Sequence, residues 1–275
     1  MAKIIKSLHT KDNYKMYLNL IRSLKIPHKI TRSNYTLKIE SEFLNIHFTP
    51  RMDENAFKVS NMIKRDIKVC GMEMPDINKR ELKYFNFAHE EILRRSEGKT
   101  IYNIDIKSAY ASNLMANKII AKDTYNYMAT LSKKNRLAAV GMLAAKKEVL
   151  CYDDAGICIS HDRIVKPTEN WFYYCVLETQ KLMLDIKDIT GKDFLFYWVD
   201  GIFFNNKDHT QKIANYLFNK GYRYSFDVCE DFKFSEVNGY RELSYSKEGG
   251  RKILNMPAVN YDANNFLLKF LNLIK

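Results

Sequence analysis

Glycine and proline are scarce in this chain, which has 10 glycines and 5 prolines among 275 residues. This scarcity excludes collagen-like and low-complexity chains. Cysteine is also rare, and the five cysteines include no Cys-x-x-Cys pair, so we expect reduced core thiols and not a zinc site. The longest apolar run, 137–145, is too short to span a bilayer, which takes about 20 residues, and no signal-peptide core is present. The sequence therefore predicts a cytoplasmic protein, or one of the host cytoplasm if it is viral, with no membrane partner.

Basic side chains outnumber acidic ones by 44 to 32, which gives a formal net charge of +12. The lysines and arginines recur along the whole chain, and 18 tyrosines and 16 phenylalanines are interleaved with them. This pattern favours a nucleic-acid partner in a long groove, with aromatic rings as stacking surfaces for bases. A soluble protein with a lysine-rich surface and an aromatic core is the alternative. The heavy use of Lys, Asn and Ile suggests an AT-rich source such as a phage, a plasmid or another mobile element.

Residues 1–98 are predicted to form an N-terminal α+β region of unknown role. Apolar residues at helical spacing predict a helix over 11–25, and alternation predicts a hairpin over 35–48. A short helix is expected over 90–95, ending near Gly98. These residues are too few for a separate exonuclease fold, so no proofreading activity is expected.

A second region, predicted over 99–240, has a sharper pattern. Alternation predicts strands at 100–106, 194–199, 202–204 and 222–229. Helices are expected from Ser108, over 131–148, after Pro167 and after a capping box at Asp208. Asp200-Gly201 is the predicted hairpin turn between two of the strands. This order predicts an α+β fold of the ferredoxin-like, split βαβ type, followed by a small C-terminal segment over 241–275.

Two aspartates occupy special places in that arrangement. Asp105 lies at the end of the first strand, and Asp200 lies at the tip of the hairpin. Two carboxylates on neighbouring central strands suit a pair of Mg²⁺ ions, which bind carboxylate and phosphate oxygens. Two such ions stabilise both the attacking and the leaving oxygen of an in-line phosphoryl transfer. For either aspartate alone, a strand-end or turn residue is the alternative interpretation.

The segment around Asp105 resembles a polymerase motif. Residues 105–112 read Asp-Ile-Lys-Ser-Ala-Tyr-Ala-Ser. They are similar to motif A of family B DNA polymerases, Asp-x-x-Ser-Leu-Tyr-Pro-Ser, and depart from it at Ala109 and Ala111.

Three further segments follow in the order of that family. Residues 133–141 are similar to motif B, Lys-x-x-x-Asn-Ser-x-Tyr-Gly, although Leu137 replaces Asn and Val140 replaces Tyr. Residues 196–203 are similar to motif C, Tyr-Gly-Asp-Thr-Asp-Ser-x-Phe, with Asp200 on the second Asp and Trp198 in place of the first. Residues 245–247, Tyr-Ser-Lys, resemble the Lys-Tyr region where palm meets thumb.

This resemblance covers about 99–255 and implies a compact DNA polymerase that uses Mg²⁺, with Mn²⁺ as a substitute, dNTPs and primer–template DNA. It implies a palm with minimal helical fingers and a small thumb-like C-terminal segment. Catalytic metals would be held by Asp105, Asp200 and the backbone carbonyl of Ile106. The incoming nucleotide would meet the backbone amides of residues 106–110, and its contacts would be Lys107, Ser108, Ala109, Tyr110, Lys133 and Arg136. Tyr110 would exclude a 2′-hydroxyl, and Lys247 and Arg251 would contact DNA.

Other interpretations remain open. Lys133 and Arg136 also fit a solvated helix face, and Tyr110 also fits a core aromatic residue. Lys133 follows Asp105 by only 28 positions, so any fingers element is short. A palm-like accessory protein that binds nucleic acid and a two-carboxylate nuclease are the alternative functions. The primer type and any processivity or priming partner are not predicted.

Overall fold

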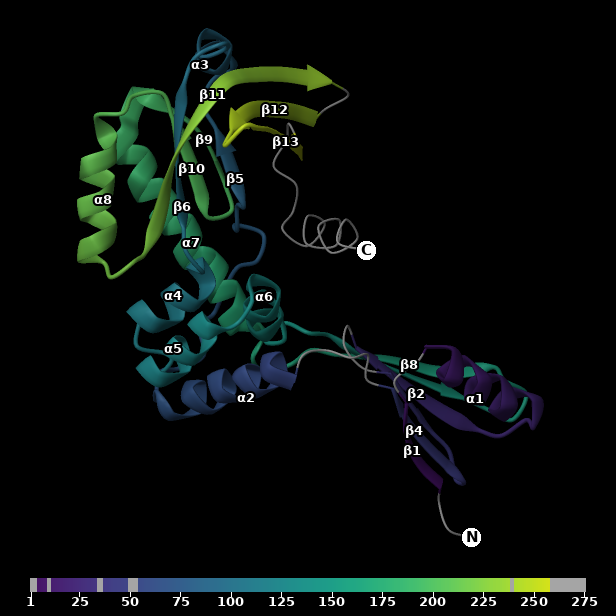
Figure 1. The fold of residues 1–275 in the computed structure, drawn as a ribbon. Helices are drawn as coiled ribbons and strands as arrows, with labels where there is room; N and C mark the ends of the chain where they lie inside the picture. The colour runs from purple at the N-terminus through teal and green to yellow at the C-terminus, as the bar shows by residue number, and fades with distance from the viewer. Residues whose placement is uncertain (1–3, 9–10, 34–36, 49–53, 238–239, 258–275) are drawn as a thin grey trace. The chain divides into compact units, whose positions relative to one another are not determined.

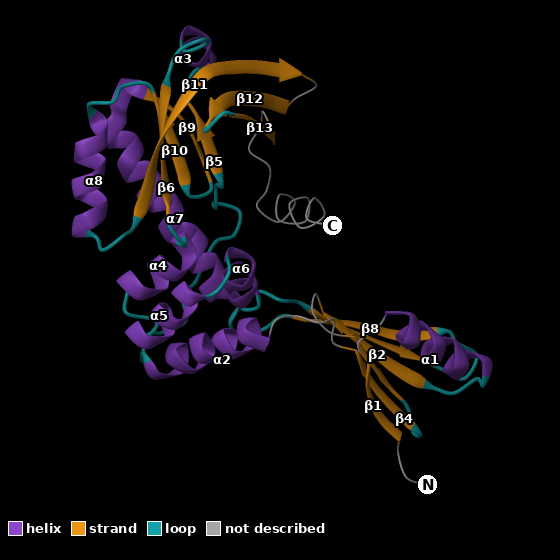
Figure 2. Cartoon of the chain, in the orientation of Figure 1, coloured by secondary structure: helices purple, strands orange, loops and turns teal. Residues whose placement is uncertain are grey.

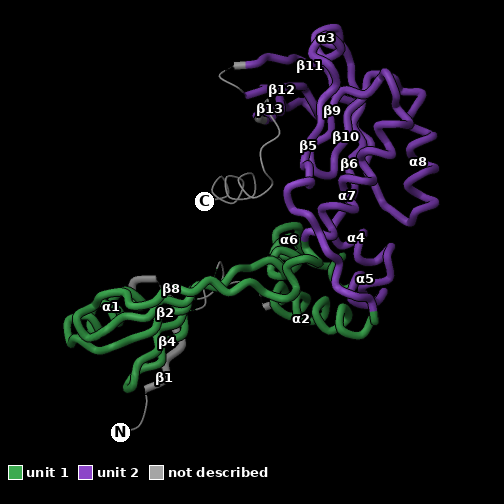
Figure 3. The backbone as a smooth tube through the Cα atoms, turned by 180° about the vertical axis from the view of Figure 1, so that it is seen from behind, with its two compact units in different colours: residues 1–71, 126–172 green, residues 72–125, 173–275 purple. Residues whose placement is uncertain are grey.

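The computed structural model describes residues 4–8, 11–33, 37–48, 54–237 and 240–257, and it has a mixed α+β fold (Figure 1). The chain divides into two compact units (Figure 3). Unit 1 comprises residues 1–71 and 126–172, and unit 2 comprises residues 72–125 and 173–275. These limits differ from the boundaries predicted after residues 98 and 240, because strands far apart in the sequence pair within each unit.

Unit 1 contains a six-stranded sheet in the order β1-β4-β3-β2-β7-β8. Its strands are β1 (Ile4–Leu8), β2 (His28–Ser33), β3 (Leu37–Glu40), β4 (Leu44–Phe48), β7 (Lys147–Tyr152) and β8 (Cys158–Ile164). Neighbouring strands are antiparallel except β1 and β4, which are parallel. Its helices are α1 (Lys11–Ser23), α2 (Glu54–Val69) and α6 (Lys133–Gly141), and α5 (Lys122–Thr130) crosses the boundary between the units. Tyr14 and Ile21 of α1 pack against Ile39 and Ile46 of the sheet.

Unit 2 contains a seven-stranded antiparallel sheet in the order β13-β12-β11-β6-β10-β9-β5. Its strands are β5 (Phe85–Phe87), β6 (Ile101–Ile106), β9 (Phe194–Trp198), β10 (Gly201–Phe204), β11 (Tyr224–Val237), β12 (Tyr240–Lys247) and β13 (Gly250–Pro257). Its helices are α3 (Glu90–Arg95), α4 (Ala109–Ala116), most of α7 (Glu169–Thr190), η1 (Gly191–Asp193) and α8 (His209–Asn219). The predicted segment 241–275 therefore begins within this sheet, and residues 258–275 lie outside the described part of the chain.

The centre of this sheet has the predicted split βαβ order. Strand β10 lies between β6 and β9 and is antiparallel to both, so β6 and β9 are parallel strands separated by a third. Helices α7 and α8 lie on one face of the sheet (Figure 2). We call their contact with the sheet the helix-side core, and its buried residues include Ile104, Ile106, Leu182, Ile186, Phe204, Ile213 and Leu217.

Strand β6 directs its residues alternately to the two faces of the sheet. Tyr102, Ile104 and Ile106 pack on the helix-side core, so Asn103 and Asp105 lie on the opposite face. This opposite face is strongly curved, because Phe203 of β10 and Tyr245 of β12 have ring centroids only 5.4 Å apart. Two strands separate them, and a flat sheet would place them about 14 Å apart.

Two local predictions were wrong. The helix predicted over 131–148 ends at Gly141, because residues from Lys147 onward form β7, which pairs with β2. This long-range pairing overrides the helical propensity of the alanines. The helix predicted after Asp208 is present as α8, but the side chain of Asp208 makes no capping bond, so the predicted capping box is absent. The backbone amide of Asp208 donates to Oδ1 of Asn206 at 3.0 Å.

The prediction that the cysteines are reduced thiols in the core is confirmed for two of them. Within the described residues no disulfide joins the five cysteines, of which Cys175 and Cys229 are buried and Cys158 is exposed. Burial raises the pKa of the Cys229 thiol to about 12, with a further contribution from the charge of Asp227. None of the helices in the described part of the chain is long and apolar enough to cross a membrane.

Candidate active site

Asp105 is the central residue of the candidate site. It lies near the end of β6, half-buried, directly opposite Gly201 of β10. A Cβ atom on Gly201 would lie 3.5 Å from Oδ1 of Asp105 and 3.4 Å from Nδ2 of Asn103. Because Gly201 has no side chain, the volume that a methyl group would occupy in van der Waals contact with the Asp105 carboxylate is left unfilled.

Asp200 directly precedes that glycine in a tight turn. Trp198 pairs with Gly201, so the two turn residues are Val199 and Asp200, one residue earlier than the predicted Asp200-Gly201 turn. The amide of Ile106 donates to the carbonyl oxygen of Asp200 at 2.9 Å, which places Asp200 diagonally across the strand pair from Asp105. The structure thus brings together the two predicted metal-binding aspartates, and Ile106 lies beside them.

The hairpin turn has an unusual backbone. Val199 has a φ of +54°, which is a strained conformation for a β-branched residue. Its amide donates to the carbonyl oxygen of Tyr84 at 2.6 Å, a bond that stabilises this conformation. Backbone strain of this kind is concentrated at functional sites, and here it lies next to Asp200.

The turn after Asp105 connects β6 to α4. The amide of Lys107 donates to the carbonyl oxygen of Arg223 at 2.8 Å, and Ser108 has a φ of +53°. The amides of Ile106 and Lys107 are therefore both engaged within unit 2, which removes two of the five amides of the predicted triphosphate contact. The Lys107 side chain is exposed, and the Ser108 side chain makes no capping bond to α4.

A buried asparagine fixes the position of α4. Nδ2 of Asn113 donates to the Cys175 carbonyl and to Oγ1 of Thr179, each at 2.8 Å. Oδ1 of Asn113 accepts a hydrogen bond from the Tyr222 hydroxyl at 2.7 Å. This network connects α4 to α7 and to the residues before β11, so the turn after Asp105 is held from two sides.

Tyr110 lies in the first turn of α4. Its ring is half-buried and packs against the helix-side core. Burial raises the pKa of its hydroxyl well above 10, and the charges of Tyr84 and Asp200 raise it further. The structure therefore places Tyr110 near Asp200, in a position that fits both a core residue and a wall of the site.

An ion pair that the sequence does not predict lies on the same face as Asp105. Asp227 and Ser225 of β11 lie opposite Asn103 and Asp105 of β6. Oδ2 of Asp227 lies 2.6 Å from Nζ of Lys247, the predicted DNA contact on β12. The Lys247 amine donates a hydrogen bond to the Asp227 carboxylate, and this bond raises the pKa of the amine. The alternation of residues 222–229 shows that Asp227 and Ser225 share a face, but only the strand register places them beside Asp105.

Tyr245 completes this face. It is buried against Phe203, and burial raises the pKa of its hydroxyl to about 12. Electrostatic interactions with Cys229, Asp227 and Asp105 raise it further. One face of unit 2 thus carries aspartates, a lysine and a neutral phenol from three adjacent strands.

The predicted contacts of motif B belong to the other unit. Lys133 is exposed at the start of α6, and the Arg136 guanidinium donates to the Leu131 carbonyl. Both residues are part of unit 1, whereas Asp105 and Asp200 are part of unit 2. Their contact with a nucleotide stays a prediction.

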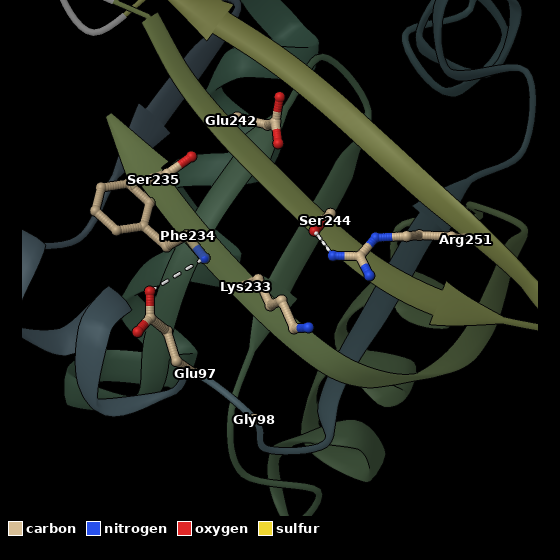
Figure 4. Close-up of a pocket in the computed structure, with 8 residues that line it drawn as sticks. All are labelled: Glu97, Gly98, Lys233, Phe234, Ser235, Glu242, Ser244 and Arg251. Atoms are coloured by element: carbon tan, nitrogen blue, oxygen red, sulfur yellow. Dashed lines mark hydrogen bonds between the residues drawn. The ribbon is translucent and has the colours of Figure 1, made fainter. Parts of the chain in front are cut away.

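Arg251, the other predicted DNA contact, lines an open pocket of about 400 Å³ on β11, β12 and β13 (Figure 4). Its guanidinium donates to Oγ of Ser244 at 2.8 Å. Two bases and two acids line the pocket, namely Lys233, Arg251, Glu97 and Glu242, so its charges balance. Neither Asp105 nor Asp200 is among the residues that line it.

The donor set suits Mg²⁺. Asp105 and Asp200, which are neighbours across the β6–β10 pair, match the way this ion binds, through one or two carboxylates with water and substrate phosphates as the other ligands. Within the described residues no set of three or more His, Cys, Asp or Glu side chains is close enough to hold a metal ion. A site built by protein side chains alone, such as structural zinc, would need such a set.

Comparison with known proteins gives no family assignment. No family model matches the chain, and no curated protein matches it.

Proposed function

We propose that this protein is a template-directed DNA polymerase that adds dNTPs to a primer 3′ end by two-metal phosphoryl transfer. In this proposal the seven-stranded sheet of unit 2, with α7 and α8, is the palm. The short helices after β6 are minimal fingers, and the segment from β12 onward acts as a thumb.

The observation that carries the proposal is the arrangement of Asp105, Asp200 and Gly201. Asp105 lies near the end of β6, Asp200 lies in the turn directly before β10, and Gly201, opposite Asp105, has no side chain. A phosphoryl-transfer site needs room for two ions and a triphosphate beside its carboxylates. The order of motifs A, B and C along the chain supports the same function.

The predicted site residues have the following roles in the proposal. Asp105, Asp200 and the carbonyl of Ile106 would hold two Mg²⁺ or Mn²⁺ ions, which neutralise charge on the transferred phosphate. Lys107 and the amides of Ser108, Ala109 and Tyr110 would contact the triphosphate. Lys247 and Arg251 would contact the DNA backbone.

Primer extension with Mg²⁺ and dNTPs on a labelled primer–template tests the function. We expect the wild-type chain to extend the primer, and Asp105→Asn and Asp200→Asn each to lower the rate at least about 100-fold, because each removes a metal-binding charge. Binding of the duplex should change little. Asp188→Asn, an exposed aspartate of α7, is the matched control and should extend normally.

The same assay separates the alternatives. Shortening of the primer that depends on Asp105 and Asp200 would identify a nuclease. Binding without extension or shortening would identify an accessory protein. Full extension by either asparagine variant would place the metal site elsewhere.

A further inference from the structure

The net charge of the chain is divided unevenly between the two units. Unit 1 contains 21 Lys and Arg and 11 Asp and Glu, a net charge of +10. Unit 2 contains 23 and 21, a net charge of +2. The unit that holds the candidate active site therefore has little excess charge with which to attract a polyanion.

Three lysines of unit 1 lie near one another at the junction of α6 and the β7–β8 hairpin. Nζ of Lys166 donates to the carbonyl of Met142, the C-cap residue of α6, at 3.4 Å. Lys147 begins β7 and pairs with Ile164 at the end of β8, so Lys147 and Lys166 lie at the same end of the hairpin. Lys64 lies on α2, which packs against α6.

These lysines are placed at an electrostatic cost. Lys64 and Lys166 are half-buried, and burial lowers the pKa of both amines. The positive charges of Lys64 and Lys147 lower the pKa of Lys166 further. In the part of the chain that the structure describes, no carboxylate forms an ion pair with any of the three. Like charges held together without a counter-ion destabilise the free protein, and a bound anion would relieve their repulsion.

We propose that Lys64, Lys147 and Lys166 form a phosphate-binding site through which unit 1 holds the sugar–phosphate backbone of DNA. This goes beyond the proposed function, because it assigns DNA binding to unit 1 and the reaction to unit 2. Ammonium groups act as point charges without the planar fork of arginine, so the contact fits phosphates and carries no base specificity. Binding here is therefore independent of sequence and sensitive to salt.

Fluorescence anisotropy with a labelled primer–template duplex tests the site. We expect the triple variant Lys64→Gln, Lys147→Gln and Lys166→Gln to bind the duplex at least about tenfold more weakly. The slope of log K against log[salt] should also decrease in magnitude by about 3, because three phosphate contacts are lost. The matched control is Lys15→Gln, Lys68→Gln and Lys134→Gln, which removes three exposed lysines of the same unit. It removes the same charge and should weaken binding much less. Equal weakening by both triple variants would overturn the proposal, because it would show a general effect of charge and no site.

Two further readouts separate binding from folding and from catalysis. The Tm of the cluster variant should stay constant or rise, since repulsion is removed, whereas a structural role predicts a fall. Its single-turnover extension rate at saturating duplex should stay within about twofold of wild type. A lower Tm, or a lower rate at saturation, would contradict the proposed site.

The test also distinguishes this proposal from the proposed function. A wild-type chain that binds duplex but does not extend it rejects the polymerase, while the lysine variants still decide the site. A wild-type chain that binds no duplex rejects the site. If polyglutamate binds the three lysines more tightly than DNA does, the partner is an acidic protein segment and the proposal fails.

Discussion

At the scale of single residues, Tyr110 decides between two roles that predict different behaviour. If it walls the nucleotide site, Tyr110→Ala should raise ribonucleotide incorporation at least about tenfold, which is about 1.4 kcal/mol of lost discrimination. Tyr110→Phe should change little, because the ring and not the hydroxyl excludes the 2′-hydroxyl. Competition between dNTPs and rNTPs in single-nucleotide extension measures this ratio. Unfolding of the alanine variant, seen by circular dichroism, would instead identify Tyr110 as a core residue of the helix-side core.

The residues of the candidate site were predictable to different degrees. Asp105 and Asp200 could be paired from the sequence, because the strand order alone places the ends of their strands together. The importance of Gly201 was not predicted, because an Asp-Gly pair looks like an ordinary turn until the register puts the glycine opposite Asp105. The ion pair of Asp227 with Lys247 depends on the spatial approach of β11 and β12, which no local pattern encodes.

At the scale of elements, the strand pair β6–β10 makes a testable prediction. Gly201→Ala should leave the free energy of unfolding within about 1 kcal/mol, because the nearest atoms to the new methyl group lie at 3.4 Å or beyond. It should lower primer extension at least about tenfold, because the methyl group fills the space beside the Asp105 carboxylate. Chemical denaturation and extension rates measure the two effects.

A second glycine provides the control for this change. Gly250 of β13 also has room for a Cβ atom, with only the Lys247 carbonyl oxygen within 4 Å of it, at 3.7 Å, so a methyl group there would not approach the Asp105 carboxylate. Gly250→Ala should leave both stability and extension nearly unchanged. Normal extension by Gly201→Ala would show that the space beside Asp105 is not used.

Elements with strong local patterns were predicted well, and those determined by distant partners were not. The helix over 90–95 and the strand ending at Ile106 follow from local spacing, and the structure confirms both. The second half of the helix predicted over 131–148 forms β7, because β2, more than 100 residues earlier, pairs with it. The two-unit division has the same origin, since contacts between distant segments determine it.

At the scale of the whole molecule, each unit has a carboxylate that links its stability to pH. In unit 2, a hydrogen bond from His209 at 2.8 Å holds the pKa of the Asp193 carboxyl below its usual value of 3.8, and Asn206 adds a second bond. In unit 1, the Arg32 guanidinium, 2.5 Å away, holds the pKa of Glu148 below 4.5. Both groups bind protons more weakly in the folded state than in the unfolded state.

These lowered pKa values predict an acid-sensitive fold. Their contributions to stability are fully present above pH 3.8 for Asp193 and above pH 4.5 for Glu148, and are lost as pH falls through the lower folded values. Urea midpoints measured between neutral pH and pH 3 should therefore fall with pH, and Asp193→Asn and Glu148→Gln should each flatten part of that decline. At neutral pH the Asp193 variant should lose more stability than the Glu148 variant, because the Arg32 partner of Glu148 is exposed and its ion pair is screened by water. A pH dependence as steep in the double variant as in wild type would show that other carboxyl groups link stability to pH.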